Sequence, residues 1–193
     1  MDGAERVQVE SREAWRTWLE RNHTREEGVW LVTFKKRCGD RYVAYGAVVE
    51  EALCFGWIDS RPRKLDEDRT TLWLAPRQAG SGWSKLNKER AARMIAAERM
   101  APAGLAKLEA AKADGSWNAL DAVDALEVPP DLAEALAAYP QAGLHFDAFP
   151  PSVRRGILEW ISSAKRPQTR AKRVRETARL AQDNERANQW RRS

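Results

Sequence analysis

The chain has 193 residues, of which 43% are hydrophobic and 32% are charged, and its formal net charge is +5. This length suits one domain, or one domain with a helical extension, and the apolar fraction argues against global disorder. No stretch approaches the roughly 18 apolar residues that a membrane span needs, and no secretory leader is visible. With two unpaired cysteines, Cys38 and Cys54, we expect a cytoplasmic protein with free thiols.

Hydrophobic spacing in the first half predicts a small sheet packed with two helices. Pro62 favours an edge position or a kink for the strand that contains it, and the turn LDED is expected to join the last two strands as a hairpin. The predicted helices cover 11–22 and 44–56, and the predicted strands cover 28–36, 57–63 and 69–76. We therefore expect an antiparallel sheet of three strands in an α+β fold.

The second half has only helical patterns. The predicted helices cover 85–100, 101–115, 129–140, 141–149, 150–165 and 166–183. The sequence thus predicts an α+β domain over 1–100, a helical module over 101–183 and a frayed basic tail over 184–193.

Positive charge gathers near the C-terminus, where residues 165–193 hold 10 basic and 3 acidic residues. Either this block contacts an anion or a nucleic acid, or it is a solvated surface that pairs with the acidic middle of the chain. The candidate basic docking surface on the last helix consists of Arg170, Arg173, Arg175 and Arg179.

Motifs for common catalytic and metal sites are missing from the sequence. Neither histidine, His23 or His145, has a neighbour at metal-ligand spacing, and no phosphate-loop, dinucleotide-binding or nucleophile-elbow motif occurs. The acidic pair Glu50 and Glu51 is predicted on a solvated helix face, and the acidic run at 66–68 in the hairpin turn. We therefore predict no catalytic residue, no metal and no cofactor.

The stretch from residue 53 to residue 90 mixes three tryptophans with arginine, aspartate, serine and asparagine. In an extended strand, alternate residues from Trp57 to Arg63 share one face. The start of the helix after Trp83 would suit an anion, because backbone N–H groups point out of a helix N-terminus. The candidate ligand-binding residues are Trp57, Asp59, Arg61, Arg77, Trp83, Ser84 and Asn87. A structural alternative stays open, with the tryptophans in the core, Ser84 as a helix cap and Asp59 paired with Arg77.

Four segments resemble the bacterial YdeI/OmpD-associated (OmdA-like) family of bacteriocin-protection proteins. These segments are ALCFGWIDS, LAPRQAGSGWSKLN, MAPAGLAKLEAAKADGSW and FDAFPPSVRRGILEWISSAKRPQTRAKRV. Together they place the resemblance over roughly residues 28–182. The resemblance implies a cytoplasmic protein linked to tolerance of bacteriocins or antimicrobial cationic peptides, and it brings no catalytic residues.

Three functions follow as hypotheses. The favoured one is a stress or resistance protein that binds a protein partner or a small anionic ligand and is not an enzyme. The second is a nucleic-acid-binding protein that uses the tryptophan- and arginine-rich stretch and the basic last helix. The third is an enzyme acting on a small anionic substrate, for which Asp59 is the one acid to nominate. The oligomeric state is left open by the sequence.

Overall fold

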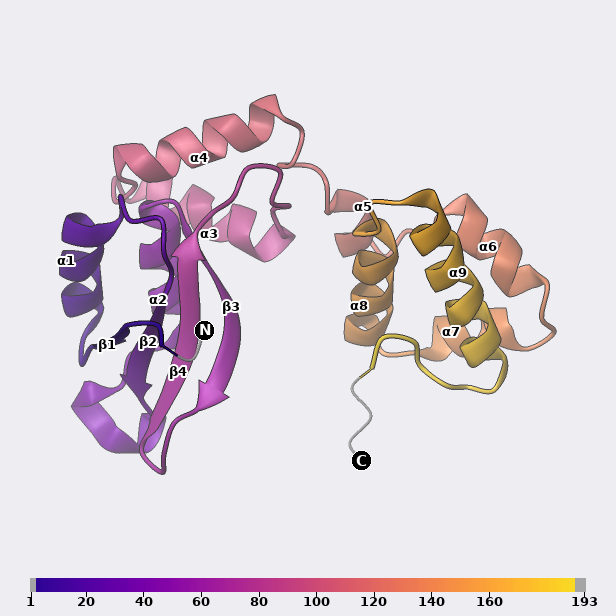
Figure 1. Ribbon diagram of the computed structural model, residues 1–193, viewed down its shortest axis with the longest axis horizontal. Helices are drawn as coiled ribbons and strands as arrows, with labels where there is room; N and C mark the ends of the chain where they lie inside the picture. The colour runs from indigo at the N-terminus through magenta and orange to yellow at the C-terminus, as the bar shows by residue number, and fades with distance from the viewer. Residues whose placement is uncertain (1–2, 190–193) are drawn as a thin grey trace. The chain divides into compact units, whose positions relative to one another are not determined.

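The computed structural model describes residues 3–189 and divides the chain into two compact units, Met1–Ala119 and Leu120–Ser193 (Figure 1). The first unit is α+β and the second is entirely helical, which confirms the predicted fold class. The sequence placed the boundary between the two parts at residue 100, whereas the structure places it after Ala119. The helix over Pro102–Ala113 belongs to the first unit because it packs against the helix over Tyr45–Cys54.

Four strands form one sheet in the order β1-β2-β4-β3. Their bounds are Arg6–Gln8 for β1, Val29–Phe34 for β2, Trp57–Lys64 for β3 and Arg69–Pro76 for β4. The strands β2, β4 and β3 pair antiparallel, as predicted, and β3 lies at an edge, as Pro62 suggested. The strand β1 was not predicted and runs parallel to β2. Three residues are too few to give a periodic signal.

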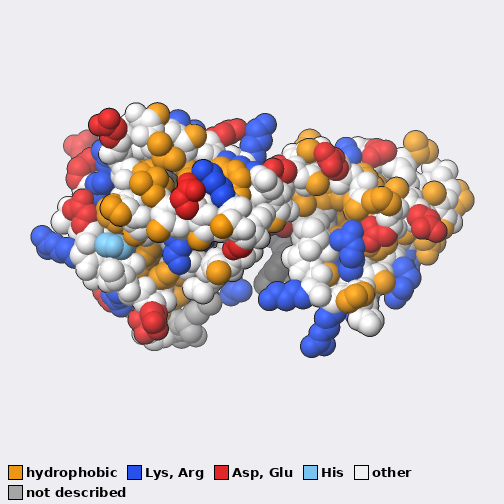
Figure 2. Space-filling model, turned by 90° about the horizontal axis from the view of Figure 1, so that it is seen from above, with side chains coloured by type: hydrophobic (Ala, Val, Ile, Leu, Met, Phe, Trp, Pro, Cys, Tyr) orange, Lys and Arg blue, Asp and Glu red, His pale blue; other side chains and the backbone are white. Residues whose placement is uncertain are grey.

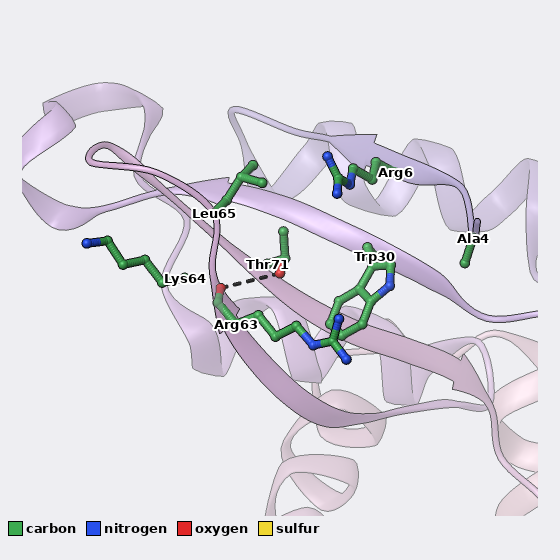
Figure 3. A pocket seen from close by; sticks show the side chains of 7 residues that line it. All are labelled: Ala4, Arg6, Trp30, Arg63, Lys64, Leu65 and Thr71. Atoms are coloured by element: carbon green, nitrogen blue, oxygen red, sulfur yellow. Dashed lines mark hydrogen bonds between the residues drawn. The ribbon is translucent and has the colours of Figure 1, made fainter. Parts of the chain in front are cut away.

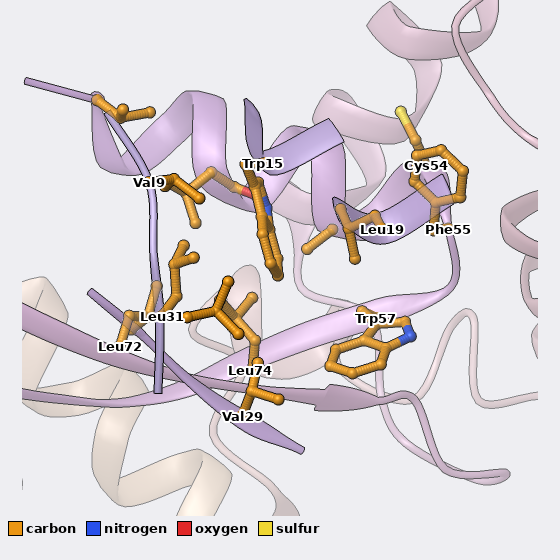
Figure 4. Packing of buried hydrophobic residues seen from close by; sticks show 14 of the residues in the cluster. Val9, Trp15, Leu19, Val29, Leu31, Cys54, Phe55, Trp57, Leu72 and Leu74 are labelled. Carbon is orange, nitrogen blue, oxygen red and sulfur yellow. The ribbon is translucent and has the colours of Figure 1, made fainter. Parts of the chain in front are cut away.

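The main core of the first unit lies between one face of the sheet and the helices α1, Arg12–Asn22, and α2, Tyr45–Cys54. Trp15 and Leu19 of α1 are fully buried against Leu74 of β4 and Trp57 of β3 (Figure 4). Helix α1 begins where the sequence predicted, because the Ser11 side chain accepts a hydrogen bond from the Ala14 backbone N–H at 3.0 Å.

A second core of the first unit joins α2 to two further helices, α3 over Lys85–Ala96 and α4 over Pro102–Ala113. Helix α4 approaches α2 closely at Gly104, where an added Cβ would lie 2.3 Å from the Cys54 carbonyl oxygen. No side chain fits this contact, so glycine is required there. A short 3-10 helix, η1 over Lys36–Arg41, follows β2.

The second unit has five helices within the described residues and a core of its own. The helices are α5 over Asp121–Asp124, α6 over Pro130–Ala137, α7 over Ala142–Ala148, α8 over Pro151–Ser162 and α9 over Pro167–Gln182. Leu132, Phe146 and Ile157 are fully buried in this core. Proline starts α6, α8 and α9, where its missing N–H has no partner to lose.

The predicted frayed tail over 184–193 is described as far as residue 189, and residues 190–193 lie outside the described part. In the described part, Ala187 is 1% exposed and packs in the second unit's core. The Arg186 guanidinium lies 5.9 Å from the centre of the Phe149 ring. Among the described helices, none combines the length and apolar character that crossing a bilayer requires.

Candidate functional site

A β-bulge in β3 decides which of the predicted site residues share a face. Asp59 pairs with Leu74 and Pro62 with Leu72, so β3 has one residue more than β4 between these two pairs. An extra residue turns the strand over. Trp57 and Asp59 therefore share a face with Pro62, whereas Arg63 lies on the opposite face. The alternation that placed Trp57, Asp59 and Arg63 together thus stops at the bulge.

Asp59 makes its hydrogen bond with a residue that the sequence did not single out. The Tyr45 hydroxyl, at the start of α2, donates to an Asp59 carboxylate oxygen at 2.5 Å. Burial raises the pKa of Tyr45 to about 12, and the hydrogen bond to Asp59 and its negative charge add to the effect. Tyr45 is 52% exposed, so this pair can be reached from solvent.

Helix α3 brings two more polar side chains to the same place. Ser84 caps the helix, accepting a hydrogen bond from the Asn87 backbone N–H at 3.4 Å. The Asn87 side-chain oxygen accepts from Arg90 Nη1 at 2.9 Å, and the Arg90 guanidinium lies 5.6 Å from the centre of the Tyr45 ring. We call Tyr45, Asp59, Asn87 and Arg90 the polar cluster. It joins α2, β3 and α3.

Arg77 and Trp83 lie beside one another at the end of β4. The Arg77 guanidinium is 4.0 Å from the centre of the Trp83 ring, and the two residues are 3% and 1% exposed. Burial lowers the pKa of Arg77 to about 10, while the charge of Asp59 acts to raise it. Asp59 therefore links this pair electrostatically to the polar cluster.

Two predicted site residues lie apart from these groups. Trp57 is fully buried in the main core, where its indole N–H donates to the His23 carbonyl oxygen at 3.0 Å. Its ring meets the Trp18 ring edge-on at 5.7 Å. Arg61 is exposed within the bulged part of β3. The structure thus brings together Asp59, Arg77, Trp83, Ser84 and Asn87. The buried tryptophans and the Ser84 cap agree with the structural alternative, whereas the hydrogen bond of Asp59 goes to Tyr45 and not to Arg77.

Two of the four arginines of the predicted basic docking surface make hydrogen bonds within the second unit. Arg170 makes a bidentate pair with Asp131, through Nε at 2.7 Å and Nη2 at 2.9 Å. Arg173 donates to the Trp160 carbonyl oxygen and lies over its ring. Arg175 and Arg179 are exposed. In the view of Figure 2, basic and acidic side chains of this unit are intermingled. The face seen there therefore carries charges of both signs and no continuous stripe of basic residues.

The sheet face opposite the main core has a hollow of about 300 Å³. The Arg63 guanidinium lies 4.5 Å from the centre of the Trp30 ring there, while Lys64 points away from that ring (Figure 3). Trp30 is 5% exposed. The bulge is what delivers Arg63 to this face.

Glu51 corrects an expectation from the sequence. Its side chain, predicted on a solvated helix face, is fully buried in α2. Arg12 Nε, Arg16 Nη1 and Arg99 Nη2 donate to it at 2.6, 2.7 and 2.8 Å. Burial alone would raise the pKa of Glu51, but these three hydrogen bonds outweigh it and lower the pKa. Two adjacent glutamates in a helix gave no sign of this, because the arginines come from distant segments.

The residues that the sequence missed at the polar cluster, Tyr45 and Arg90, had a weak local signal. Arg90 follows Asn87 by three residues, which places both on one face of a helix. Tyr45 lies in the predicted helix over 44–56, and only the fold shows its hydroxyl facing Asp59.

Comparison with known families separates the two units. Residues 7–107 match the model of a family described as a domain of unknown function, DUF8412. Residues 125–184 match the model described as "Bacteriocin-protection, YdeI or OmpD-Associated". The resemblance expected over roughly 28–182 is thus confirmed in the second unit, and a different family model covers the first. Searches of curated proteins and of solved structures found no match.

Proposed function

Because the chain belongs to the DUF8412 family and its second unit carries a bacteriocin-protection, YdeI or OmpD-associated domain, we propose that it protects bacterial cells against bacteriocins. The match over residues 125–184 is the observation that carries the proposal. It covers the whole of α6 to α9 and most of the core of the second unit.

The proposed mode of action is binding of a protein partner or an anionic ligand in the cytoplasm. The polar cluster supports binding, because Tyr45 is half exposed and its neighbours Asp59 and Asn87 are half-buried. Their hydrogen bonds fix the side chains before a ligand arrives, and preorganisation lowers the entropic cost of association. The free thiols of Cys38 and Cys54 support a reducing compartment.

A survival assay tests the proposal. A bacteriocin-sensitive strain that expresses the full chain should survive higher bacteriocin concentrations than the same strain with an empty vector. Asp59→Asn removes a charge from the polar cluster, and Glu109→Gln removes one from an exposed pair with Lys112 in α4. We expect the first substitution to reduce protection and the second to leave it unchanged. Equal survival with and without the chain would refute the proposal.

The nucleic-acid alternative is favoured by one observation. Arg6, Arg63 and Lys64 line the hollow on the open sheet face. Because the Trp30 ring is buried, this surface offers phosphate contacts and no stacking platform. Binding of single-stranded DNA should then weaken steeply with salt, with a slope set by the number of phosphates contacted. A flat salt response, or no binding at low salt, would exclude this function.

A further inference from the structure

Arg77 is a buried cation that keeps unused hydrogen-bond donors. Its Nη2 donates to the carbonyl oxygens of Ser81 and Gly82, at 3.2 and 2.5 Å. Within residues 3–189, Nε and Nη1 of Arg77 have no hydrogen-bond partner, and the indole N–H of Trp83 has none either. Three buried donor nitrogens that lack an acceptor therefore lie on two side chains in direct contact.

Such an arrangement is costly unless something accepts these hydrogen bonds. An unpaired buried donor costs about 1–3 kcal/mol, and an unpaired buried charge costs more. Carbonyl oxygens at Nη2 supply partial negative charge only. Asp59 is the carboxylate whose charge acts on Arg77, and its hydrogen bond goes to Tyr45. The guanidinium thus lacks a hydrogen-bonded counterion among the described residues.

Both side chains line a small cavity in the first unit. Its volume is about 60 Å³, and its walls come from the loop after β4 and from α4. This is several times the roughly 15 Å³ that one water needs, and too little for a nucleotide or a peptide. Lys107, exposed on α4, adds a second positive charge to the wall.

Asp114 is the acidic group on this wall, and its carboxylate is already engaged. One of its oxygens accepts from the Gly80 backbone N–H at 3.1 Å and the other from the Ser116 backbone N–H at 2.8 Å. Hydrogen bonds from Ser116 and Gly80 lower the pKa of Asp114, so it stays ionised while it ties the loop to α4. Among the other polar side chains on this wall, Arg77, Trp83 and Lys107 can only donate, whereas Gln78, Ser81 and Ser116 can both donate and accept.

We propose that the cavity between Arg77, Trp83 and Lys107 binds a small oxyanion of the inorganic phosphate type. Such an oxyanion offers several acceptor oxygens to the donors of Arg77, Trp83 and Lys107, and its negative charge supplies the missing counterion. The inference rests on the proposed function, in that it names an anionic ligand for this end of the first unit. The survival assay tests protection against bacteriocins, whereas a binding measurement tests the oxyanion site. Either proposal can therefore fail without the other.

The test is a titration of the full chain with inorganic phosphate, followed by NMR of ¹⁵N-labelled protein. The Trp83 indole N–H and the Arg77 Nε–H signals, assigned through Trp83→Phe and Arg77→Lys, should shift in a saturable way, with a Kd near or below about 1 mM. Sodium chloride at equal ionic strength should leave both signals in place. Saturation by phosphate but not by phenyl phosphate would support a free ion, and saturation by both would support the phosphate group of a larger ligand.

Two substitutions at exposed positions guard against loss of folding. Lys107→Met should weaken phosphate binding about tenfold, the cost of one charge-assisted hydrogen bond. Arg61→Met, which removes an exposed guanidinium of β3 outside the cavity, should leave the Kd unchanged. If neither the Trp83 nor the Arg77 signal moves with phosphate, water satisfies these donors and the proposal is wrong. Equal weakening by both substitutions would likewise overturn it, because binding would then be a surface effect.

Discussion

The buried Glu51 carboxylate should be one of the largest single contributors to the stability of the first unit. Replacing it by glutamine keeps the shape of the side chain but removes the charge that Arg12, Arg16 and Arg99 share. Three guanidinium groups would then face one another across a neutral amide. Repulsion among them adds to the loss of the hydrogen bond where the amide NH2 replaces a carboxylate oxygen, and to the weakening of the hydrogen bonds that the remaining oxygen accepts.

The expected size of the effect follows from burial. Removing one partner of a buried ion pair costs about 3–5 kcal/mol. The three arginine side chains are 25%, 29% and 38% exposed, so water screens part of the charge left behind, and we take the lower end, about 3 kcal/mol. At an unfolding entropy of about 2.1 cal/mol/K per residue, a unit of this size loses about 12 °C in Tm.

Thermal and urea unfolding, followed by far-UV circular dichroism, measure this change. Glu109→Gln is the matched control, because Glu109 forms an exposed pair with Lys112 and should cost at most about 0.5 kcal/mol. The folded pKa of Glu51 lies below its unfolded value of about 4.3. Its contribution is therefore present above that pH and lost as pH falls through the folded pKa. A loss below about 1 kcal/mol at pH 7, or a gap that widens in acid, would refute this account of Glu51.

The remaining predictions concern packing, titration and independent folding. Gly104→Ala should destabilise the first unit by about 1–3 kcal/mol in urea, because its Cβ would meet the Cys54 carbonyl oxygen. Gly156→Ala, in open space on α8, should stabilise the second unit by up to about 1 kcal/mol. If Gly156→Ala were the more destabilising of the two substitutions, the close contact between α4 and α2 at Gly104 would be contradicted. In a spectrophotometric pH titration, Asp59→Asn should bring the pKa of Tyr45 down from about 12, and an unchanged titration would show that burial alone sets it. Because no described core cluster spans both units, each unit expressed apart should melt cooperatively, and failure of either would show dependence on the other.

Local periodicity was enough to predict most of the fold. The α-helices and strands of six residues or more left a pattern of apolar residues, whereas the 3-10 helix η1 left none. Ser11 and Ser84 lie at helix starts that the structure confirms. The strand β1 escaped because three residues carry no period. The β-bulge in β3 was not predicted, because Pro62 indicates an irregular edge strand but does not indicate an extra residue in that strand.

The grouping of the candidate site residues was predictable in part from the sequence, and the environment of each side chain was less so. The stretch from 53 to 90 does bring Asp59, Arg77, Trp83 and Asn87 to one end of the first unit. Composition could not separate Trp57, which packs in the main core, from Trp83, which packs beside Arg77. It also could not show that Arg77 is buried with unused donors, since that depends on the path of the loop after β4.

The irregular edge of the sheet has a further consequence, for what the protein does at high concentration. An outer strand normally offers a row of N–H and C=O groups on which another chain can add, and from which fibres grow. On β3 this template is interrupted, because Pro62 has no N–H to offer, the bulge twists the strand, and Arg61 and Lys64 place charge beside it. The opposite edge, β1, is three residues long and too short to seed a ladder. The deformation that carries Arg63 to the far face thus also guards the first unit against edge-to-edge aggregation.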